Sequence, residues 1–434
     1  MKSLTSFVCQ ECGYDSPKFL GKCPECGEWN TLKELRIKDA SDLKPAFLDS
    51  QERVEPHTLS EISEEKKTRI TTGFSEFDNV LGGGIVSGSV ILLAGDPGIG
   101  KSTLLLQTGL NISEKLKVLY ISGEESDAQI KIRAERISKN KKAELLVTSI
   151  TSTDAVISEV EKIRPDLVII DSIQMMESEN LTGLSGSVGQ VRYAASQFIK
   201  IAKTLNIAFI IVGHVTKEGM VAGPMVLSHM VDTVLFLEGE KNTGTRILRS
   251  LKNRFGPVDE VGIFAMEGSG MREVKNPEEL FLTDAKSPGS VLVATMEGTR
   301  SFLVEVQALA VYSKLPMPRR VASGIDYKRL ELLLAVLQKH CRLPVEQMDI
   351  YVNVAGGLKL SDPATDLGIC LAVFSSVKNI TLSKTVGIAE VGLLGELRTP
   401  SFLDKRVSQA KKLGFTKIVT PKHFETLDSV LKSF

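Results

Sequence analysis

A glycine-rich stretch at residues 95–103 has the residue types and spacing needed to hold nucleotide phosphates. It reads GDPGIGKST, follows the apolar run Ser89–Ala94 and opens a helical pattern over Thr103–Ile112. Glycines let consecutive backbone amides converge on phosphate oxygens, and a helix amino terminus adds partial positive charge. In this context the lysine reaches the β and γ phosphates, and the serine hydroxyl ligates Mg²⁺. The stretch predicts an ATP and Mg²⁺ site formed by Gly95, Asp96, Pro97, Gly98, Ile99, Gly100, Lys101, Ser102 and Thr103.

Carboxylates follow two other apolar runs in the same part of the chain. Asp171 ends the run Leu167–Ile170 and is the predicted second Mg²⁺ ligand, since a metal-side carboxylate is expected at the end of another strand. Glu124 and Glu125 follow the run Val118–Ser122, and either could polarise the attacking water. An acidic pair that merely begins a helix is the alternative interpretation. We favour Glu124 as the catalytic group, with Glu125 second.

Further polar residues lie at or near later strand ends. His214 follows the run Ile210–Gly213 and is a candidate γ-phosphate sensor, although a lone histidine is more often structural. Four cations lie on or just after one predicted strand, and a solvated edge strand is the alternative interpretation of this run: Arg246, Arg249, Lys252 and Arg254.

Four of the six cysteines crowd into the first 26 residues as two Cys-x2-Cys pairs, each followed by glycine. Four thiolates can close a tetrahedral zinc site, and a segment of about 30 residues cannot form a stable core without such a staple. Two disulfides or redox cysteines are the alternative, which a cytosolic location disfavours. Because all four positions are filled by protein, the metal is expected to be structural or recognitional. The predicted Zn²⁺ ligands are Cys9, Cys12, Cys23 and Cys26.

The elements that must position these residues follow a regular order. From residue 71 to about residue 266, strand-like apolar runs alternate with amphipathic stretches. This alternation is typical of an α/β fold with a parallel sheet covered by helices on both faces. Ile247–Leu251 and Val261–Met266 are expected to close the sheet as antiparallel strands, and a Pro/Gly break at 287–289 begins a separate α/β domain.

Composition excludes some classes of protein. Lysine plus arginine (53) equals aspartate plus glutamate (53), so the chain is not a general polycation that coats nucleic acid. No apolar run approaches the length of about eighteen residues that a membrane span needs, so no membrane partner is expected. The start of the chain lacks an apolar core of signal-peptide length, which favours a cytoplasmic location.

Several motifs together resemble the bacterial RadA (Sms) family of DNA repair proteins, over essentially the whole chain. In order, they are the four-cysteine module, GDPGIGKST, IIDSIQ at residues 169–174, KNRFG at residues 252–256 and an α/β tail. KNRFG is the most specific of them, because very many proteins share the P-loop.

The resemblance implies a RecA-like ATPase that forms a homo-hexameric ring and is stimulated by single-stranded DNA. It implies a role in DNA recombination and in the response to DNA damage. There the family acts on branched DNA intermediates and promotes branch migration alongside the RecA recombinase. It also implies that Lys252 and Arg254 act near a neighbouring subunit's nucleotide, or on DNA.

The final region resembles the proteolytic domain of Lon proteases. Asp366 falls where that family has its nucleophilic serine, and a basic residue remains near the position of its catalytic lysine, at Lys405-Arg406. A carboxylate cannot replace a hydroxyl as the acyl acceptor. The region is therefore expected to be proteolytically inactive and to serve as a scaffold for the ring. A DNA path and ordinary solvated charge are equal alternatives for its basic residues Arg319, Arg320, Lys328 and Arg329.

The expected domains are a four-cysteine zinc finger at 1–32, a charged linker at 33–70, a RecA-like ATPase domain at 71–275 and a Lon-protease-like domain at 286–434. Two other function classes stay open. A RecA-type signalling ATPase or autokinase, not coupled to DNA, would also carry paired glutamates, but the zinc module and KNRFG argue against it. An ATP-dependent protease is disfavoured by Asp366.

Overall fold

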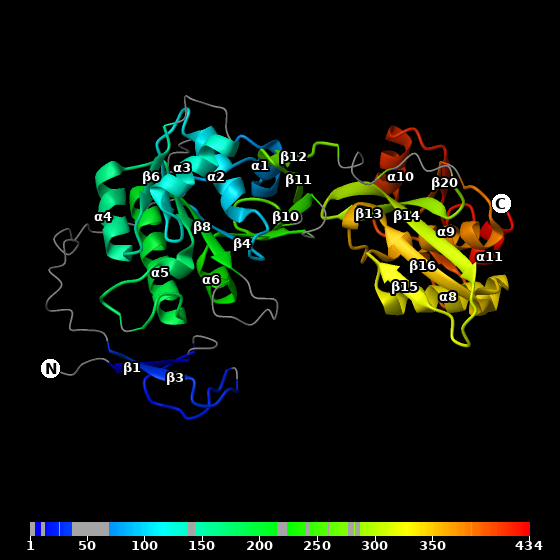
Figure 1. The fold of residues 1–434 in the computed structure, drawn as a ribbon, viewed down its shortest axis with the longest axis horizontal. Coiled ribbons are helices and arrows are strands. Elements are labelled where there is room, and N and C mark those ends of the chain that lie inside the picture. Colours follow the sequence, from blue (N-terminus) through cyan, green and yellow to red (C-terminus); the bar gives the residue numbers. More distant parts are fainter. Residues whose placement is uncertain are drawn as a thin grey trace, which may run out of the picture. The chain divides into compact units, whose positions relative to one another are not determined.

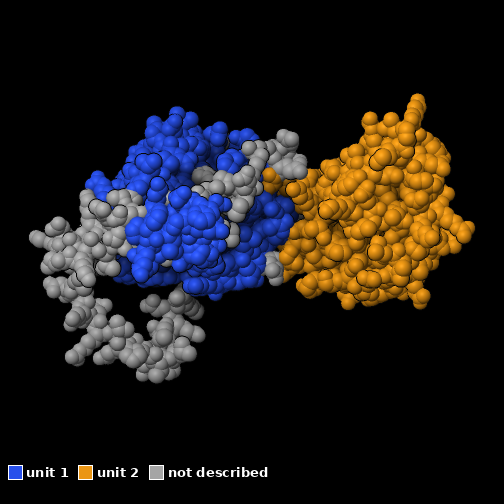
Figure 2. Space-filling model, turned by 90° about the horizontal axis from the view of Figure 1, so that it is seen from below, with its two compact units in different colours: residues 1–238, 246–273 blue, residues 239–245, 274–434 orange. Residues whose placement is uncertain are grey.

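A computed structural model describes residues 5–9, 14–25, 27–36, 69–137, 144–181, 183–214, 224–239, 244–258, 260–276, 282, 287–382 and 384–434. The chain divides into two compact units, residues 1–238 with 246–273 and residues 239–245 with 274–434 (Figure 2). The first unit contains the N-terminal module and the ATP-site motifs. The second contains the Lon-like region.

The N-terminal module is a small antiparallel sheet with the strand order β2-β1-β3. Its strands are β1 (Thr5–Cys9), β2 (Asp15–Ser16) and β3 (Leu32–Arg36). Cys9 and Cys23 are fully buried in a cluster with Leu32. Because β3 pairs with β1 as far as Arg36, the module extends past residue 32.

A nine-stranded sheet forms the centre of the first unit, in the order β12-β11-β10-β9-β4-β8-β7-β5-β6. Its strands are β4 (Val90–Gly95), β5 (Val118–Ser122), β6 (Leu146–Ser149), β7 (Leu167–Asp171), β8 (Ala208–His214), β9 (Thr233–Glu238), β10 (Thr245–Asn253), β11 (Val261–Glu267) and β12 (Gly270–Glu273). The strands from β9 to β6 in this order are parallel, and β10 is antiparallel to β9. β10 lies inside the sheet, so the solvated edge strand suggested for its cations is wrong.

Helices cover both faces of this sheet (Figure 1). Ile91 and Leu93 of β4 pack with α1 (Ser75–Leu81), α2 (Lys101–Ile112) and α3 (Asp127–Ile137). Val90 and Leu92 pack on the opposite face with α4 (Thr153–Ile163), α5 (Val188–Leu205) and α6 (Pro224–Met230). Because successive side chains of a strand point to opposite faces, one apolar run supplies both cores. The predicted α/β class is confirmed.

The second unit has a six-stranded mixed sheet in the order β15-β16-β14-β13-β17-β20, and a separate β18–β19 pair. Its strands are β13 (Ser290–Glu297), β14 (Arg300–Tyr312), β15 (Arg320–Ser323), β16 (Met348–Val354), β17 (Thr385–Gly387), β18 (Glu390–Val391), β19 (Leu397–Arg398) and β20 (Lys417–Val419). Its helices are α8 (Tyr327–Cys341), α9 (Asp366–Lys378), α10 (Leu403–Lys412) and α11 (Leu427–Leu431). Short 3₁₀ turns complete the chain: Ile173–Met175, Val345–Gln347, Ala355–Gly357 and Pro363–Thr365. β15, β18, β19 and α11 are two to five residues long, which is too short to show a period in the sequence.

Within the described residues, no helix is both long and apolar enough to cross a lipid bilayer.

Candidate nucleotide site

The phosphate loop connects the end of β4 to the start of α2. Gly95, Gly98 and Gly100 have φ angles of 151°, 76° and 114°, which side chains rarely adopt. Close packing adds to this requirement at two of the three glycines. A Cβ on Gly95 would lie 2.3 Å from the Leu237 carbonyl oxygen, and one on Gly100 would lie 2.4 Å from Met266 Cε. The helix begins at Lys101, two residues earlier than predicted, so its first amides belong to the loop.

Lys101 is folded back over this loop. Its Nζ donates hydrogen bonds to the carbonyl oxygens of Gly95 at 2.8 Å and Asp96 at 3.0 Å. Burial lowers the pKa of Lys101, while the charges of Asp171 and Glu124 oppose that shift. The ammonium group is thus held beside two carboxylates, where a phosphate could replace the loop carbonyls as its partner.

Strand register brings the predicted residues together at the carboxyl ends of the parallel strands, which form one edge of the sheet. Gly95 at the end of β4 pairs with His214 at the end of β8. Ser122 at the end of β5 pairs with Asp171 at the end of β7, and β7 is the neighbour of β8. Carboxyl ends of adjacent parallel strands are the usual place for ligands in open α/β sheets. The loop, Asp171, the glutamates after β5 and the backbone of His214 therefore share one edge.

Asp171 is buried, with 6% of its surface exposed, and Tyr120 of β5 donates a hydrogen bond to its Oδ2 at 2.5 Å. Burial, with the nearby Asp171 charge, raises the pKa of Tyr120 well above its usual range, so its hydroxyl remains a donor. A neutral donor leaves the negative charge of the carboxylate for a cation. Mg²⁺ prefers such oxygen ligands, and the Ser102 hydroxyl lies in the first turn of α2, so the residues present fit the expected metal.

The two glutamates after β5 have different partners. Ser172 donates a hydrogen bond from Oγ to Oε1 of Glu124 at 2.6 Å, next to Asp171. Glu125 forms an ion pair with Arg133 of α3. Glu124 is exposed at the sheet edge, whereas Glu125 is partly buried. The arrangement favours Glu124 as the residue that could contact a water molecule at the phosphates.

The two cysteine pairs form matched turns. Cys9 N–H donates to Tyr14 O and Cys23 N–H donates to Glu28 O, both at 2.9 Å and both five residues on. Their burial in one cluster fits a shared metal. Cys12 and Cys26 lie outside the described residues, and the described residues contain no cluster of three or more His, Cys, Asp or Glu side chains that could hold a metal ion. The matched turns and the shared burial of Cys9 and Cys23 support the predicted zinc site.

Two family models match the regions that contain these residues. Residues 56–220 match an AAA domain family model, and residues 7–34 match a rubredoxin metal binding domain. The chain is 46% identical to the DNA repair protein RadA of Streptococcus pyogenes serotype M6 and 48% identical to that of Bacillus subtilis. Each alignment covers 97% of this chain and 93% of the relative. The RadA protein of Listeria monocytogenes is 47% identical, over 98% of this chain and 93% of its own length.

The chain belongs to the RadA family of DNA repair proteins. The first unit is accordingly a RecA-like ATPase core preceded by a zinc ribbon. The crystal structure of the RadB recombinase is also similar, with a TM-score of 0.38 and 24% identity over 48% of this chain and 100% of that chain.

The KNRFG motif of the RadA family lies beside the amino ends of the parallel strands, whereas the phosphate loop lies at their carboxyl ends. Asn253 at the end of β10 pairs with Thr233 at the start of β9. Asp232 N–H, just before it, donates to Val90 O at the start of β4 at 3.0 Å. The five-residue advance from Val90 to Gly95 corresponds to about 17 Å along the strand. The predicted Lys252 and Arg254 are therefore remote from their own chain's nucleotide site.

Each cation of the run has a separate partner. Lys252 Nζ donates to the carbonyl oxygens of Ser228, in the last turn of α6, at 2.7 Å and of Val231, just after that helix, at 2.8 Å. Arg254 pairs with Asp232 at 3.3 Å and keeps 58% of its side chain exposed. The other two cations contact Ile99 O (Arg246) and Glu238 (Arg249).

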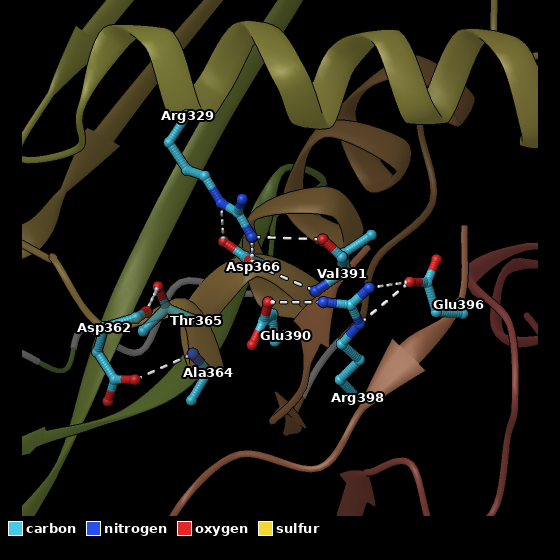
Figure 3. A network of polar contacts seen from close by, with 9 residues as sticks. All are labelled: Arg329, Asp362, Ala364, Thr365, Asp366, Glu390, Val391, Glu396 and Arg398. Atoms are coloured by element: carbon cyan, nitrogen blue, oxygen red, sulfur yellow. Dashed lines mark hydrogen bonds and ion pairs between the residues drawn. The ribbon is translucent and has the colours of Figure 1, made fainter. Parts of the chain in front are cut away.

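The second unit has two ion pairs, each with one almost fully buried partner, at the residues for which the sequence suggested a likeness to Lon proteases. Asp366, only 1% exposed, pairs with Arg329 and accepts a hydrogen bond from Val391 N–H at 3.2 Å (Figure 3). Burial raises the pKa of Asp366, and the bonds from Arg329 and Val391 oppose that shift. Arg406, also 1% exposed, donates to Asp362 at 2.5 Å.

These contacts change the interpretation of the basic residues in this unit. Arg329 is engaged with Asp366, and Arg320 donates to the carbonyl oxygens of Val345 at 2.6 Å and Met348. Both contacts favour structural roles over the DNA path considered from sequence. Arg319 and Lys328 are exposed and stay available to that prediction.

Three residues with contacts in the nucleotide site were not predicted: Tyr120, Ser172 and Arg246. Tyr120 stands inside an apolar run, and Ser172 directly follows the metal-side aspartate. A tyrosine among buried aliphatic residues needs a hydrogen-bond partner, which was the available signal for Tyr120. Nothing local distinguished Arg246 from Arg249.

Proposed function

We propose that this chain is a cytoplasmic, DNA-dependent ATPase that works as a homo-hexameric ring motor on single-stranded and branched DNA. In this proposal it promotes branch migration during strand exchange by the RecA recombinase. The observation that carries it is the meeting of the phosphate loop, Asp171 and Glu124 at one sheet edge. The RadA names of relatives that align over 97% of the chain supply the DNA repair context.

The chain's own residues account for each requirement of ATP hydrolysis. The loop amides and the Lys101 ammonium would bind the β and γ phosphates, and Glu124 would orient the attacking water. Ser172 would hold Glu124 in place through its 2.6 Å hydrogen bond. Ser102 and Asp171 would hold Mg²⁺, which when bound neutralises charge on the phosphoryl oxygens.

Lys252 and Arg254 are proposed to act on the nucleotide of a neighbouring subunit. Their position at the edge opposite the phosphate loop supports this assignment, because their own nucleotide is out of reach. Head-to-tail contacts in a ring place different edges of two copies against each other. A cation supplied in this way stabilises charge on the transferred phosphoryl group. Arg254, with 58% of its side chain exposed, is better suited to reach a partner than Lys252.

The test is ATP hydrolysis by the purified protein with and without single-stranded DNA, with Lys101→Ala as the blank. Several-fold stimulation by DNA that is absent from the blank is the expected result. An ATPase rate that does not change when DNA is added would favour the signalling ATPase or autokinase instead. Transfer of labelled γ-phosphate to the protein would then identify an autokinase. A wild-type ATPase rate in Lys101→Ala would contradict the assignment of the ATP site to the phosphate loop.

The two glutamates can be separated by matched substitutions. Glu124→Gln should lower the rate by about a hundredfold, since a general base contributes about 10²- to 10⁴-fold. Glu125→Gln should lower it much less, because Glu125 pairs with Arg133. Equal losses in the two variants, or a larger loss in Glu125→Gln, would reverse the assignment. His214→Ala tests the proposed γ-phosphate sensor by whether ATP and ADP affinities change unequally.

Zinc is proposed to fold the N-terminal module independently of the ring. Cys23→Ser should therefore release the metal while the chain still elutes as a ring on gel filtration, with its ATPase rate retained. The zinc content of the purified variant gives the first measurement. A monomeric product would show that the module is part of the assembly.

A further inference from the structure

The outer wall of the phosphate loop is formed by strands that follow the ATPase motifs in sequence. Met266 of β11 and Met271 of β12 bring their Cε atoms so close to Gly100 that a Cβ there would lie 2.4 and 2.6 Å from them. Arg246, at the start of β10, donates a hydrogen bond from Nε to the Ile99 carbonyl oxygen at 2.9 Å. The loop is thus contacted on this side by all three antiparallel strands.

Arg246 is an unusual residue for such a wall. Only 5% of its surface is exposed, and burial lowers its pKa. A guanidinium group is costly to bury unless hydrogen bonds compensate for its lost hydration. An apolar side chain would cover the loop without this cost. The hydrogen bond to Ile99 O is therefore part of what compensates the buried guanidinium group.

Peptide geometry shows how this hydrogen bond orients the next amide of the loop. The Ile99–Gly100 peptide bond is trans, since the one cis bond within the described residues joins Asp171 to Ser172. In a trans peptide the carbonyl group and the following N–H point in opposite directions. A bond that holds Ile99 O toward the outer wall therefore aims the Gly100 N–H toward the opposite side, the interior of the loop. That interior is where a phosphate-binding loop needs its donors.

The wall itself is fixed to the helix that follows the loop. Gln107 of α2 donates from Nε2 to Met271 O at 3.1 Å, and Met271 N–H donates to Gln107 Oε1 at 2.7 Å. This two-point contact holds α2 against β12. The strands that carry Arg246 and the two methionines are thus fixed to α2, the helix that directly follows the loop.

We propose that Arg246 is a positioning residue of the nucleotide site, which aims the Gly100 amide at the phosphates through the Ile99 carbonyl. The inference rests on the proposed ATP site. A correctly aimed amide contacts phosphate both before and during the reaction, so its loss should weaken binding more than it slows saturated turnover.

The experiment compares Arg246→Met with Arg249→Met, a matched change three residues along the same strand. Arg249 pairs with Glu238 and does not contact the loop in this way. Binding of a fluorescent ADP analogue and the KM and kcat for ATP are measured on the full chain. Arg246→Met should weaken ADP binding and raise KM by about tenfold, as expected for a lost hydrogen bond to a charged group. Its kcat should fall by less than about threefold, and Arg249→Met should bind ADP as the wild type does.

A purely structural role gives a different result. If Arg246→Met binds ADP within about twofold of the wild type while its melting temperature falls, the inference is overturned. If that variant does not fold, Arg246→Lys keeps the charge and tests the geometry, and unaltered ADP binding there overturns the inference equally. Lys101→Ala separates the two levels of the argument. Loss of ADP binding in Lys101→Ala but not in the Arg246 variants would reject this inference alone, whereas no loss in Lys101→Ala would reject the ATP site.

Discussion

The two units each contain a buried aspartate at the end of a secondary-structure element, and the two carboxylates have different partners. Asp171 ends β7 with 6% of its surface exposed, and Asp366 begins α9 with 1% exposed. Tyr120, a neutral donor, holds Asp171, while the nearby Lys101 ammonium bonds to the loop carbonyls. Asp366 instead pairs with the Arg329 guanidinium and accepts the Val391 amide (Figure 3).

The difference shows why burial alone does not identify a reactive carboxylate. A buried charge requires compensation, and the source of that compensation decides its use. At Asp366 the chain supplies a cation, so the carboxylate is satisfied and its role is to hold α8, α9 and β18 together. At Asp171 the direct donor is neutral, so the site can gain a divalent cation with its nucleotide. We therefore infer that Asp171 is part of the chemistry and that Asp366 is structural.

The largest expected effect that tests this comparison is at Asp171. Asp171→Asn keeps the size and the hydrogen bond from Tyr120 but removes the charge. We expect the ATPase rate to fall by at least about a hundredfold, because a metal ligand acts directly on the transferred phosphoryl group. The melting temperature without nucleotide should change little or rise. A rate within about fivefold of the wild type would place the metal-side carboxylate elsewhere.

The corresponding change in the second unit should have the opposite result. Asp366→Asn leaves the Arg329 guanidinium without its carboxylate, and breaking a buried pair typically costs about 3–5 kcal/mol. Because Arg329 keeps 33% of its side chain exposed, we expect about 2 kcal/mol of lost unfolding free energy in this unit. Unfolding in denaturant, monitored by limited proteolysis of the second unit, measures this loss of unfolding free energy.

A second variant tests whether the pair is the cause. Replacing both partners, with Asp366→Leu and Arg329→Met together, should recover part of the stability lost in Asp366→Asn. The ATPase rate of the folded protein should stay within about twofold in all these variants. Equal stability of Asp366→Asn and the wild type, or appearance of peptide hydrolysis in the wild type, would contradict a purely structural pair.

Local sequence signals predicted one of these environments better than the other. The phosphate loop, the parallel strands and Asp171 were predicted because a strand followed by a turn and a helix is encoded within about twenty neighbouring residues. The resemblance to Lon proteases singled out Asp366, which the structure shows to be 1% exposed. Its partner Arg329 was not recognised, because the two residues are 37 positions apart, and a DNA path and ordinary solvated charge were left as equal alternatives for it.

The same limit applies around the nucleotide. Tyr120 and Asp171 are 51 positions apart, and Arg246 and Ile99 are 147 apart. No periodicity relates residues at such separations, since their contact depends on the order of strands in the sheet. Spacing alone did not distinguish the four cations on or just after β10, whereas the fold places Arg246 against the phosphate loop and Lys252 near the start of β9. Sequence therefore predicted the groups that are expected to contact ATP, but not the residues that hold those groups in place.

The smallest expected effect concerns the neutral donor on Asp171. Tyr120→Phe removes one hydroxyl from a buried ring and leaves the packing nearly intact, so the fold should be preserved. Groups that orient a metal ligand typically contribute about 10- to 100-fold to metal affinity. We expect the Mg²⁺ concentration for half-maximal ADP-dependent thermal stabilisation to rise by about tenfold. The ATPase rate at saturating Mg²⁺ should change by less than about threefold.

Tyr351→Phe, in the second unit, is the matched control and should leave both quantities unchanged. If Tyr120→Phe keeps the wild-type Mg²⁺ requirement, the 2.5 Å bond to Asp171 satisfies a buried hydroxyl and does nothing for the metal. The contrast between the two aspartates would then depend on their charge environment alone.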